Sequence, residues 1–224
     1  MLVTCWSAKG GAGTTTVAVA FAVVLARRSP HGSLLVDLGG DVPTVAGVRE
    51  PVGPGVAEWL AGGASVPADG LARLEVPLGR GVNLVPRGAG PMVDETRARV
   101  LAEVLAADPR PVVVDAGVVE APELAAPAQR IARVLAVSAT RSLLVTRACY
   151  VALRRAERLS LRPGGVVLVQ GDRRSLDRHD VEQAVGAPVV AEIPEDDATA
   201  RRVDSGLLTA RLPRAVDRAL GRAA

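Results

Sequence analysis

The sequence alternates short runs of apolar, often β-branched residues with longer stretches whose apolar positions recur every three or four residues. Short runs of this kind are typical of strands, and several are almost entirely apolar, as expected for strands buried on both faces of a sheet. The longer stretches are typical of helices with one buried side. Their alternation predicts an α/β fold, in which a mostly parallel sheet carries helices on both faces.

The patterns also give approximate boundaries for these elements. Between residues 53 and 80 the chain is rich in glycine and alanine, and only a short helix around Trp59 is predicted. No repeat, low-complexity tract or linker divides the 224 residues, so we expect one domain over 1–224. Strands are predicted at Leu2–Ser7, Leu34–Leu38, Val82–Pro86, Val112–Asp115, Val134–Ser138, Val166–Gln170 and Val189–Ile193. Helices are predicted at Thr15–Arg28, Pro91–Ala107, Ser142–Leu159, Asp177–Val185 and Leu212–Arg222.

Composition excludes several functional classes. Aromatic residues make up only 2% of the chain, too few for the stacking surfaces of a single-strand nucleic-acid binder. The longest uninterrupted apolar run, at Val17–Ala26, has about half the length of a membrane-spanning helix. No signal-peptide pattern stands at the N-terminus. We therefore expect a cytoplasmic protein.

The distribution of positive charge singles out one residue. Lys9 is the single lysine among 27 lysine and arginine residues. It lies in a glycine-rich stretch between the first predicted strand and the first predicted helix. Lysine carries a compact charge that can enter a crowded phosphate-binding loop, whereas arginine is a broad planar fork. Lys9 is therefore the first candidate for a functional residue.

The stretch from Ser7 to Thr16 reads SAKGGAGTTT and has the layout of an anion site. A glycine loop between a strand and a helix directs free backbone N–H groups and the helix dipole at one point. Glycine lets the backbone approach phosphate oxygens without a Cβ clash. The usual P-loop pattern GxxxxGK[ST] is broken, because Ala8 replaces its first glycine and Thr14 its lysine. An ordinary glycine turn remains the simpler alternative.

A dinucleotide-binding site is a second alternative. Residues 11–16 nearly match the fingerprint GxGxxG, and Asp37 ends the second predicted strand, where a ribose-binding acid would lie. The third glycine is missing, however, and this fingerprint gives Lys9 no role. An NAD-dependent oxidoreductase of the Rossmann type is therefore kept as the more distant reading.

The loop resembles the deviant P-loop of the ParA/MinD family, whose pattern KGGxGK[ST] reads KGGAGTT here. Later segments extend the resemblance over nearly the whole chain. LLVDL, which contains Asp37, resembles the strand with the family's switch aspartate, and PVVVDAG, which contains Asp115, resembles its Walker B strand. VVAEIPED, which ends at Asp196, resembles the segment that wraps the adenine. A Rossmann dehydrogenase has no reason to contain this last segment.

The resemblance implies a P-loop NTPase fold that binds ATP or ADP with Mg²⁺. It assigns catalytic roles to Lys9 and Asp37, and it assigns the metal to Thr15, Asp37 and Asp115. In relatives, the lysine that matches Lys9 reaches the nucleotide of the opposite subunit, so an ATP-dependent homodimer is implied. The implied nucleotide-binding residues are Lys9, Gly10, Gly11, Ala12, Gly13, Thr14, Thr15, Thr16, Asp115, Pro194, Glu195 and Asp196.

Two departures from the family pattern change the expected activity. Thr14 stands where the family has the lysine that grips the β- and γ-phosphates, and Gly39 stands where it has a second switch acid, with Asp41 nearby. Phosphoryl transfer depends on charge stabilisation and positioning, so slow or absent hydrolysis is expected.

The lysine-to-threonine change resembles the CpaE/TadZ branch, which is linked to pilus-assembly placement and septum-site determination. This implies a positioning switch with a protein cargo from such machinery. Many of those relatives carry a receiver-like domain before the P-loop, which begins at residue 9 here, so none is expected. A partitioning ATPase that binds DNA non-specifically is the leading alternative.

Two surfaces bear on where the protein acts. The last predicted helix has an apolar face containing Leu212, Val216 and Leu220, and helices of this kind lie on membranes in MinD-type relatives. We expect it instead to complete the domain. An arginine cluster could meet DNA phosphates, although a solvated helix face is the expected explanation. The cluster consists of Arg154, Arg155, Arg158 and Arg162.

Overall fold

The computed structural model describes residues 1–92, 96–171 and 175–224. The strands are β1 (Leu2–Ser7), β2 (Ser33–Asp37), β3 (Val76–Gly79), β4 (Val82–Val85), β5 (Val112–Val118), β6 (Arg141–Arg147), β7 (Gly165–Gln170) and β8 (Val189–Pro194). The helices are α1 (Thr14–Ala26), α2 (Val42–Ala46), α3 (Val56–Ala61), α4 (Ala98–Ala107), α5 (Pro127–Ser138), α6 (Tyr150–Arg158), α7 (Arg178–Val185), α8 (Asp197–Asp204) and α9 (Arg214–Ala223). Short 3₁₀ turns occupy Gly63–Ser65 and Ala68–Leu74.

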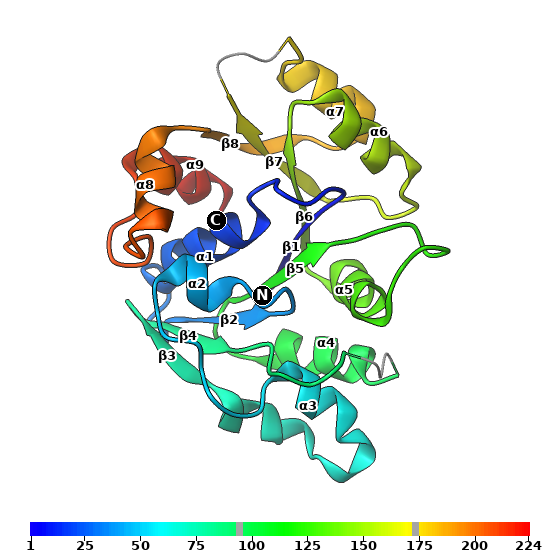
Figure 1. The fold of residues 1–224 in the computed structure, drawn as a ribbon, viewed down its shortest axis with the longest axis vertical. Helices are drawn as coiled ribbons and strands as arrows, with labels where there is room; N and C mark the ends of the chain where they lie inside the picture. Colours follow the sequence, from blue (N-terminus) through cyan, green and yellow to red (C-terminus); the bar gives the residue numbers. More distant parts are fainter. Residues whose placement is uncertain (93–95, 172–174) are drawn as a thin grey trace.

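The described strands form one eight-stranded sheet in the order β3-β4-β2-β5-β1-β6-β7-β8 (Figure 1). Only β3, at one edge, runs antiparallel to its neighbour among these strands. Helices α1, α2 and α9 cover one face, and α3 to α7 cover the other (Figure 1). The predicted fold class, a mostly parallel sheet with helices on both faces, is confirmed.

Helix α1 is the centre of one core layer. Every residue from Val17 to Ala26 is buried, because the helix lies between the sheet on one side and α2 and α9 on the other. This is the apolar run that the sequence analysis judged too short to span a membrane. None of the described helices is long and apolar enough to cross one.

Two predicted elements around residue 140 are wrong. Residues 134–138 were predicted as a strand and form the last turns of α5, and 142–159 were predicted as a helix but begin inside β6. The β-branched Val134 and Val137 favour a strand locally. Burial of Ile131, Ala132, Leu135 and Ala136 instead follows helical spacing from Pro127 onward, and packing against β1 and β5 decides the outcome.

Other differences lie at element ends. The helix predicted at 91–107 begins at Ala98, and residues 93–95 of the predicted range lie outside the described residues. Strand β3 was not predicted, because this short edge strand contains a proline and a glycine. The short helix around Trp59 and the end of β1 at Ser7 are as expected.

Helix α9 is held against α1 and β8. Its buried face consists of Val216, Leu220 and Ala223. Its polar side is tied to the end of α1, where Arg27 pairs with Asp217 at 2.9 Å and an Arg28 Nη donates a hydrogen bond to the Gly221 carbonyl. The apolar face predicted for this helix is thus covered by the fold itself.

We expect Leu220→Ala to lower the free energy of unfolding by about 2 to 4 kcal/mol, because it opens a cavity beneath a fully buried side chain. Urea unfolding followed by circular dichroism measures this change. Arg218→Ala on the exposed side of the same helix is the matched control and should change stability by less than about 0.5 kcal/mol. Equal stability of Leu220→Ala and the unmodified protein would show that α9 does not support the fold.

Candidate functional site

The glycine loop joins β1 to α1 through residues 8–13. Gly11 and Gly13 have φ angles of 76° and 91°, a left-handed backbone that strains any residue with a Cβ. Gly13 is the N-cap of α1, and no side chain of the described residues caps this first turn. The backbone N–H groups at the start of α1 are therefore free to bind an anion.

Two buried carboxylates lie side by side next to this loop. Asp37 at the end of β2 is paired in register with Asp115 on β5, and both are fully buried. Asp37 accepts hydrogen bonds from the backbone N–H groups of Gly40 at 2.7 Å and Val42 at 3.1 Å. Asp115 Oδ1 accepts one from Gly117 at 3.2 Å, whereas its Oδ2 is buried with no partner among the described residues.

Burial makes both carboxylates hard to ionise. Desolvation raises the pKa of Asp115 to about 7, the Thr15 hydroxyl acts in the opposite direction, and the charge of Asp37 adds to the rise. Desolvation also raises the pKa of Asp37 to about 6, against the hydrogen bonds from Gly40 and Val42. Two adjacent buried acids with raised pKa values form a site that favours a positive charge.

The donor set fits a hard divalent cation. Mg²⁺ prefers oxygen ligands and is usually held by one or two carboxylates together with phosphate oxygens and water. Asp115 Oδ2, for which the described part of the chain offers no partner, and the adjacent Thr15 hydroxyl are oxygens of this kind. The described residues contain no group of three or more metal-ligating side chains, so a cation here would take its other ligands from phosphate or water.

Gly39 borders the same carboxylates. A Cβ at this position would lie 3.7 Å from Asp115 Oδ2 and 3.7 Å from Asp37 Oδ1. The position at which the family pattern has an acid therefore faces the acidic pair directly. Asp41, the nearby candidate, is exposed at the start of α2, and its charge contributes to the raised pKa of Asp37.

A cavity of about 250 Å³ opens on the other side of the loop. Ala12, Gly13 and Thr16 line it, and it extends to Pro194, the last residue of β8, and to Glu195 and Asp196 after it. Asp196 is fixed there as the N-cap of α8, accepting a 2.7 Å hydrogen bond from the Thr199 N–H. The loop and the 194–196 segment, far apart in the sequence, therefore share one cavity. Its aliphatic wall is formed by Val17, Val169, Ile193, Val203 and Val216.

The remaining predicted residues lie around the loop. Lys9 is partly buried, and its Nζ donates a 3.3 Å hydrogen bond to the Gly10 carbonyl. Lys9, Gly10, Gly11 and Ala12 line a second, smaller cavity. Thr14, the first residue of α1, is buried.

One residue of this region was missed by the sequence analysis. Arg147, at the end of β6, lines both cavities. It was placed inside a predicted helix, so its position at the carboxyl edge of the sheet could not be seen. A correctly placed β6 would have been the signal, because ligands bind beyond the carboxyl ends of parallel strands.

The strand order rejects the dinucleotide-binding alternative. In the Rossmann order 3-2-1-4-5-6 the first two strands are neighbours. Here β5 lies between β1 and β2, so the strand of Asp37 is not adjacent to the strand that leads into the glycine loop. Asp115 occupies the neighbouring strand instead, which places a carboxylate beside Thr15.

Comparisons with known proteins agree with this arrangement. A family model described as the CobQ/CobB/MinD/ParA nucleotide binding domain matches residues 3–209. No curated protein sequence matches the chain significantly.

Solved structures of similar fold cover almost all of the chain. A ParA family ATPase from Chlorobium tepidum is 18% identical, with a TM-score of 0.77 over 98% of this chain and 95% of that one. The septum site-determining protein MinD of Pyrococcus horikoshii, complexed with Mg-ADP, is 20% identical, with a TM-score of 0.75 over 99% and 93%. MinD in the MinC:MinD complex of Aquifex aeolicus is 17% identical, with a TM-score of 0.73 over 99% and 92%. These similarities confirm the expected P-loop NTPase fold.

The raised pKa of Asp115 predicts a pH-dependent stability. A carboxyl whose pKa is higher in the folded than in the unfolded chain stabilises the fold while it is protonated. For Asp115 this contribution is lost as the pH rises from 3.8, the ordinary pKa of the carboxyl, through about 7, its pKa in the fold. Between pH 5 and pH 8 we expect the ligand-free protein to lose about 2 kcal/mol that Asp115→Asn does not lose. Urea unfolding at both pH values measures the difference, and parallel pH profiles for the two proteins would contradict it.

Proposed function

Because the chain belongs to the CobQ/CobB/MinD/ParA nucleotide-binding domain family, we propose that it is an ATP-binding switch that dimerises with ATP and Mg²⁺. The observation that carries this proposal is the buried Asp37–Asp115 pair beside Thr15, in which one carboxylate oxygen has no partner among the described residues. The pair lies next to a helix N-terminus that no described side chain caps. Phosphate and a divalent cation satisfy both features at once.

Each part of the site has a defined task in this proposal. The N–H groups around Gly13 bind phosphate oxygens, and the aliphatic cavity that ends at Pro194–Asp196 holds the base. Asp115, Asp37 and the Thr15 hydroxyl would hold Mg²⁺, which supplies positive charge to the phosphates. Bringing a cation to the buried carboxylates also favours their ionised form, so ligand binding and the charge state of the site are coupled.

Hydrolysis is proposed to be slow or absent. Thr14 supplies no charge where an ordinary P-loop has lysine, and Gly39 supplies no polar side chain beside the acidic pair. Both deficits affect transition-state stabilisation more than ground-state binding. With Thr14 in place of the second loop lysine, Lys9 is the lysine that the loop retains. By resemblance to the family it would contact the nucleotide bound to a partner subunit.

The cellular role is proposed by resemblance to the CpaE/TadZ branch. The nucleotide-dependent dimer would place a protein cargo of pilus-assembly or septum-site machinery. The protein would then be cytoplasmic and peripheral at the membrane, pole or nucleoid.

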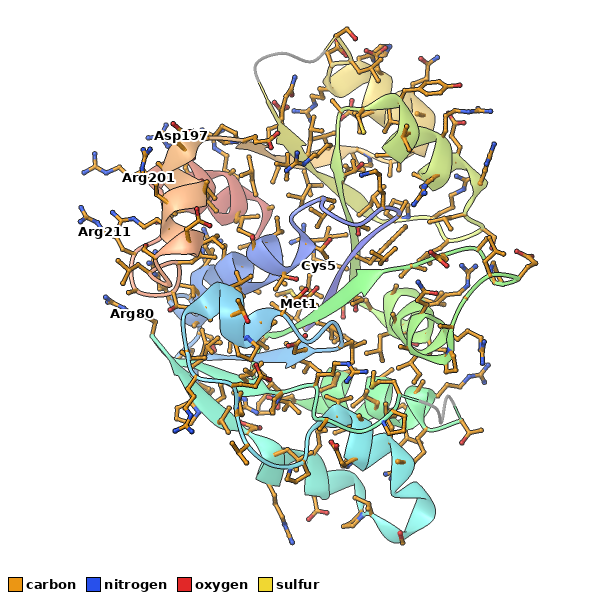
Figure 2. The ribbon with its side chains drawn as sticks, in the orientation of Figure 1. Met1, Cys5, Arg80, Asp197, Arg201 and Arg211 are labelled. Carbon is orange, nitrogen blue, oxygen red and sulfur yellow. The ribbon has the colours of Figure 1, made fainter. Side chains whose placement is uncertain are left out.

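Non-specific DNA binding, as in a partitioning ATPase, is the second candidate. Figure 2 shows Arg80, Arg201 and Arg211 projecting outward on the side of the molecule where α8 lies. The arginine cluster on and just after α6 is also exposed, and it consists of Arg154, Arg155, Arg158 and Arg162. Arginine-rich surfaces bind DNA phosphates with an affinity that falls steeply with salt. Salt-sensitive binding to random-sequence DNA that requires ATP would favour this role over protein placement.

The missing loop lysine predicts weak ATPase activity. We expect turnover far below that of an ordinary P-loop ATPase and expect Thr14→Lys to raise it about tenfold or more, because it returns a cation to the phosphates. Phosphate release measured with purified, dilute protein gives the rate. Thr14→Met is the matched control for side-chain length without charge and should give no gain. Rapid hydrolysis by the unmodified protein would contradict the expectation.

Dimerisation with ATP tests the proposed function itself. Light scattering with ATP and Mg²⁺ should show a dimer for the unmodified protein and a monomer for Lys9→Ala. Lys9→Arg should not restore the dimer, because a planar fork does not enter between two glycine loops. Thermal unfolding should leave Lys9→Ala within about 0.5 kcal/mol of the unmodified protein, since a loop lysine buries little apolar area. If all three proteins behave alike, Lys9 is not the dimer switch.

A further inference from the structure

Arg147 crosses the carboxyl edge of the sheet at the proposed nucleotide site. It is the last residue of β6, and its Nη1 pairs with Glu195 Oε1, just after β8, at 2.8 Å. Because β7 lies between β6 and β8, the side chain spans the end of β7. Its guanidinium therefore lies on the base side of the cavity, toward the Pro194–Asp196 segment.

The ion pair alone does not account for this placement. The side chains of Arg147 and Glu195 are 35% and 42% exposed, and pairs this exposed contribute little to stability. The Arg147 Nε is buried and has no partner among the described residues. An unsatisfied buried donor is costly, so its presence beside a cavity points to an acceptor that a ligand supplies.

No aromatic ring of the described residues offers the cavity a flat surface. Its wall is aliphatic, with Val169 and Ile193 beside Arg147, and no described lining residue is aromatic. Nucleobases bind most strongly against planar groups, which are usually aromatic rings or the guanidinium of arginine. The Arg147 guanidinium is the planar cation that this cavity offers.

We propose that Arg147 contacts the base and ribose of the bound nucleotide, with its guanidinium packed against the purine and held in place by Glu195. This inference rests on the proposed function and adds a positioning and binding residue to the same site. The Nε–H donates to an acceptor of the nucleoside. Arg147 thus contributes to nucleotide affinity through its planar guanidinium at the nucleoside end of the ligand, and not through added charge at the phosphates.

Calorimetry with ADP, ATP and inorganic tripolyphosphate tests this contact. Arg147→Ala should weaken ADP and ATP by the same factor, about tenfold, a typical loss for one stacking partner. Binding of tripolyphosphate, which has no base or ribose, should stay unchanged. Arg147→Lys should lose as much as Arg147→Ala, because it keeps the charge but not the plane.

The matched control is Arg178→Ala. Arg178 also pairs with a glutamate of the β8 region, Glu192, at 3.1 Å, but it lines neither cavity. The Arg178→Ala variant should bind ADP, ATP and tripolyphosphate as tightly as the unmodified protein does. The proposal would be overturned if Arg147→Ala bound ADP as tightly as the unmodified protein, or if it bound tripolyphosphate more weakly. Nucleotide affinity restored by Arg147→Lys would also overturn it. If the unmodified protein binds no nucleotide, the proposed function fails as well, which separates the two outcomes.

Discussion

The burial of α1 is the constraint on which the rest of the structure depends. With every residue from Val17 to Ala26 packed between the sheet and α2 and α9, the helix has no freedom to shift along the strands. Its first turn is therefore fixed beside β5, the strand on which Asp115 lies. The Ser33 hydroxyl adds to this by donating a 2.8 Å hydrogen bond to the Ala22 carbonyl. Rigid packing of α1 thus holds its N-terminus in place without a side-chain cap from residues that the structure describes.

The same rigidity imposes an electrostatic cost on the ligand-free protein. Parallel pairing of β2 with β5 brings Asp37 and Asp115 together in a dry environment, where neither ionises easily. Backbone hydrogen bonds offset part of this cost for Asp37, but one oxygen of Asp115 receives none from the described residues. A site of this kind is least stable when empty and ionised. Binding of a cation is then favoured by the relief of that cost as well as by direct attraction.

The sequence predicted the parts of the site whose local pattern and tertiary environment agree. The strand–loop–helix unit around Gly13 follows from its sequence pattern, and so do the acids on two buried strands. Asp115, however, was predicted at the end of its strand and lies inside β5, which continues to Val118. Arg147 was missed because the β-branched run at 134–138 lies in α5, where packing against β1 and β5 overrides local preference. Because the strand was predicted at 134–138 and not at 141–147, Arg147 was assigned to a helix and not to the cavity. The convergence of the loop with the 194–196 segment came only from the family resemblance, since no local pattern encodes a contact over such a distance.

Lys9 and Arg147, the two cationic side chains at the proposed site, differ in shape, and each has a different proposed role. The loop around Lys9 is built from glycines with left-handed backbone, and it accommodates a narrow side chain carrying a compact charge. The wall at Arg147 is aliphatic, and under the proposed function it faces the base, where a wide planar group is useful. Under the proposed function, the single lysine of the chain stands where a compact charge enters between the glycine loops of two subunits. The residue types at positions 9 and 147 therefore match the form of charge that the proposal requires at each place, a compact charge at the phosphates and a planar one at the base.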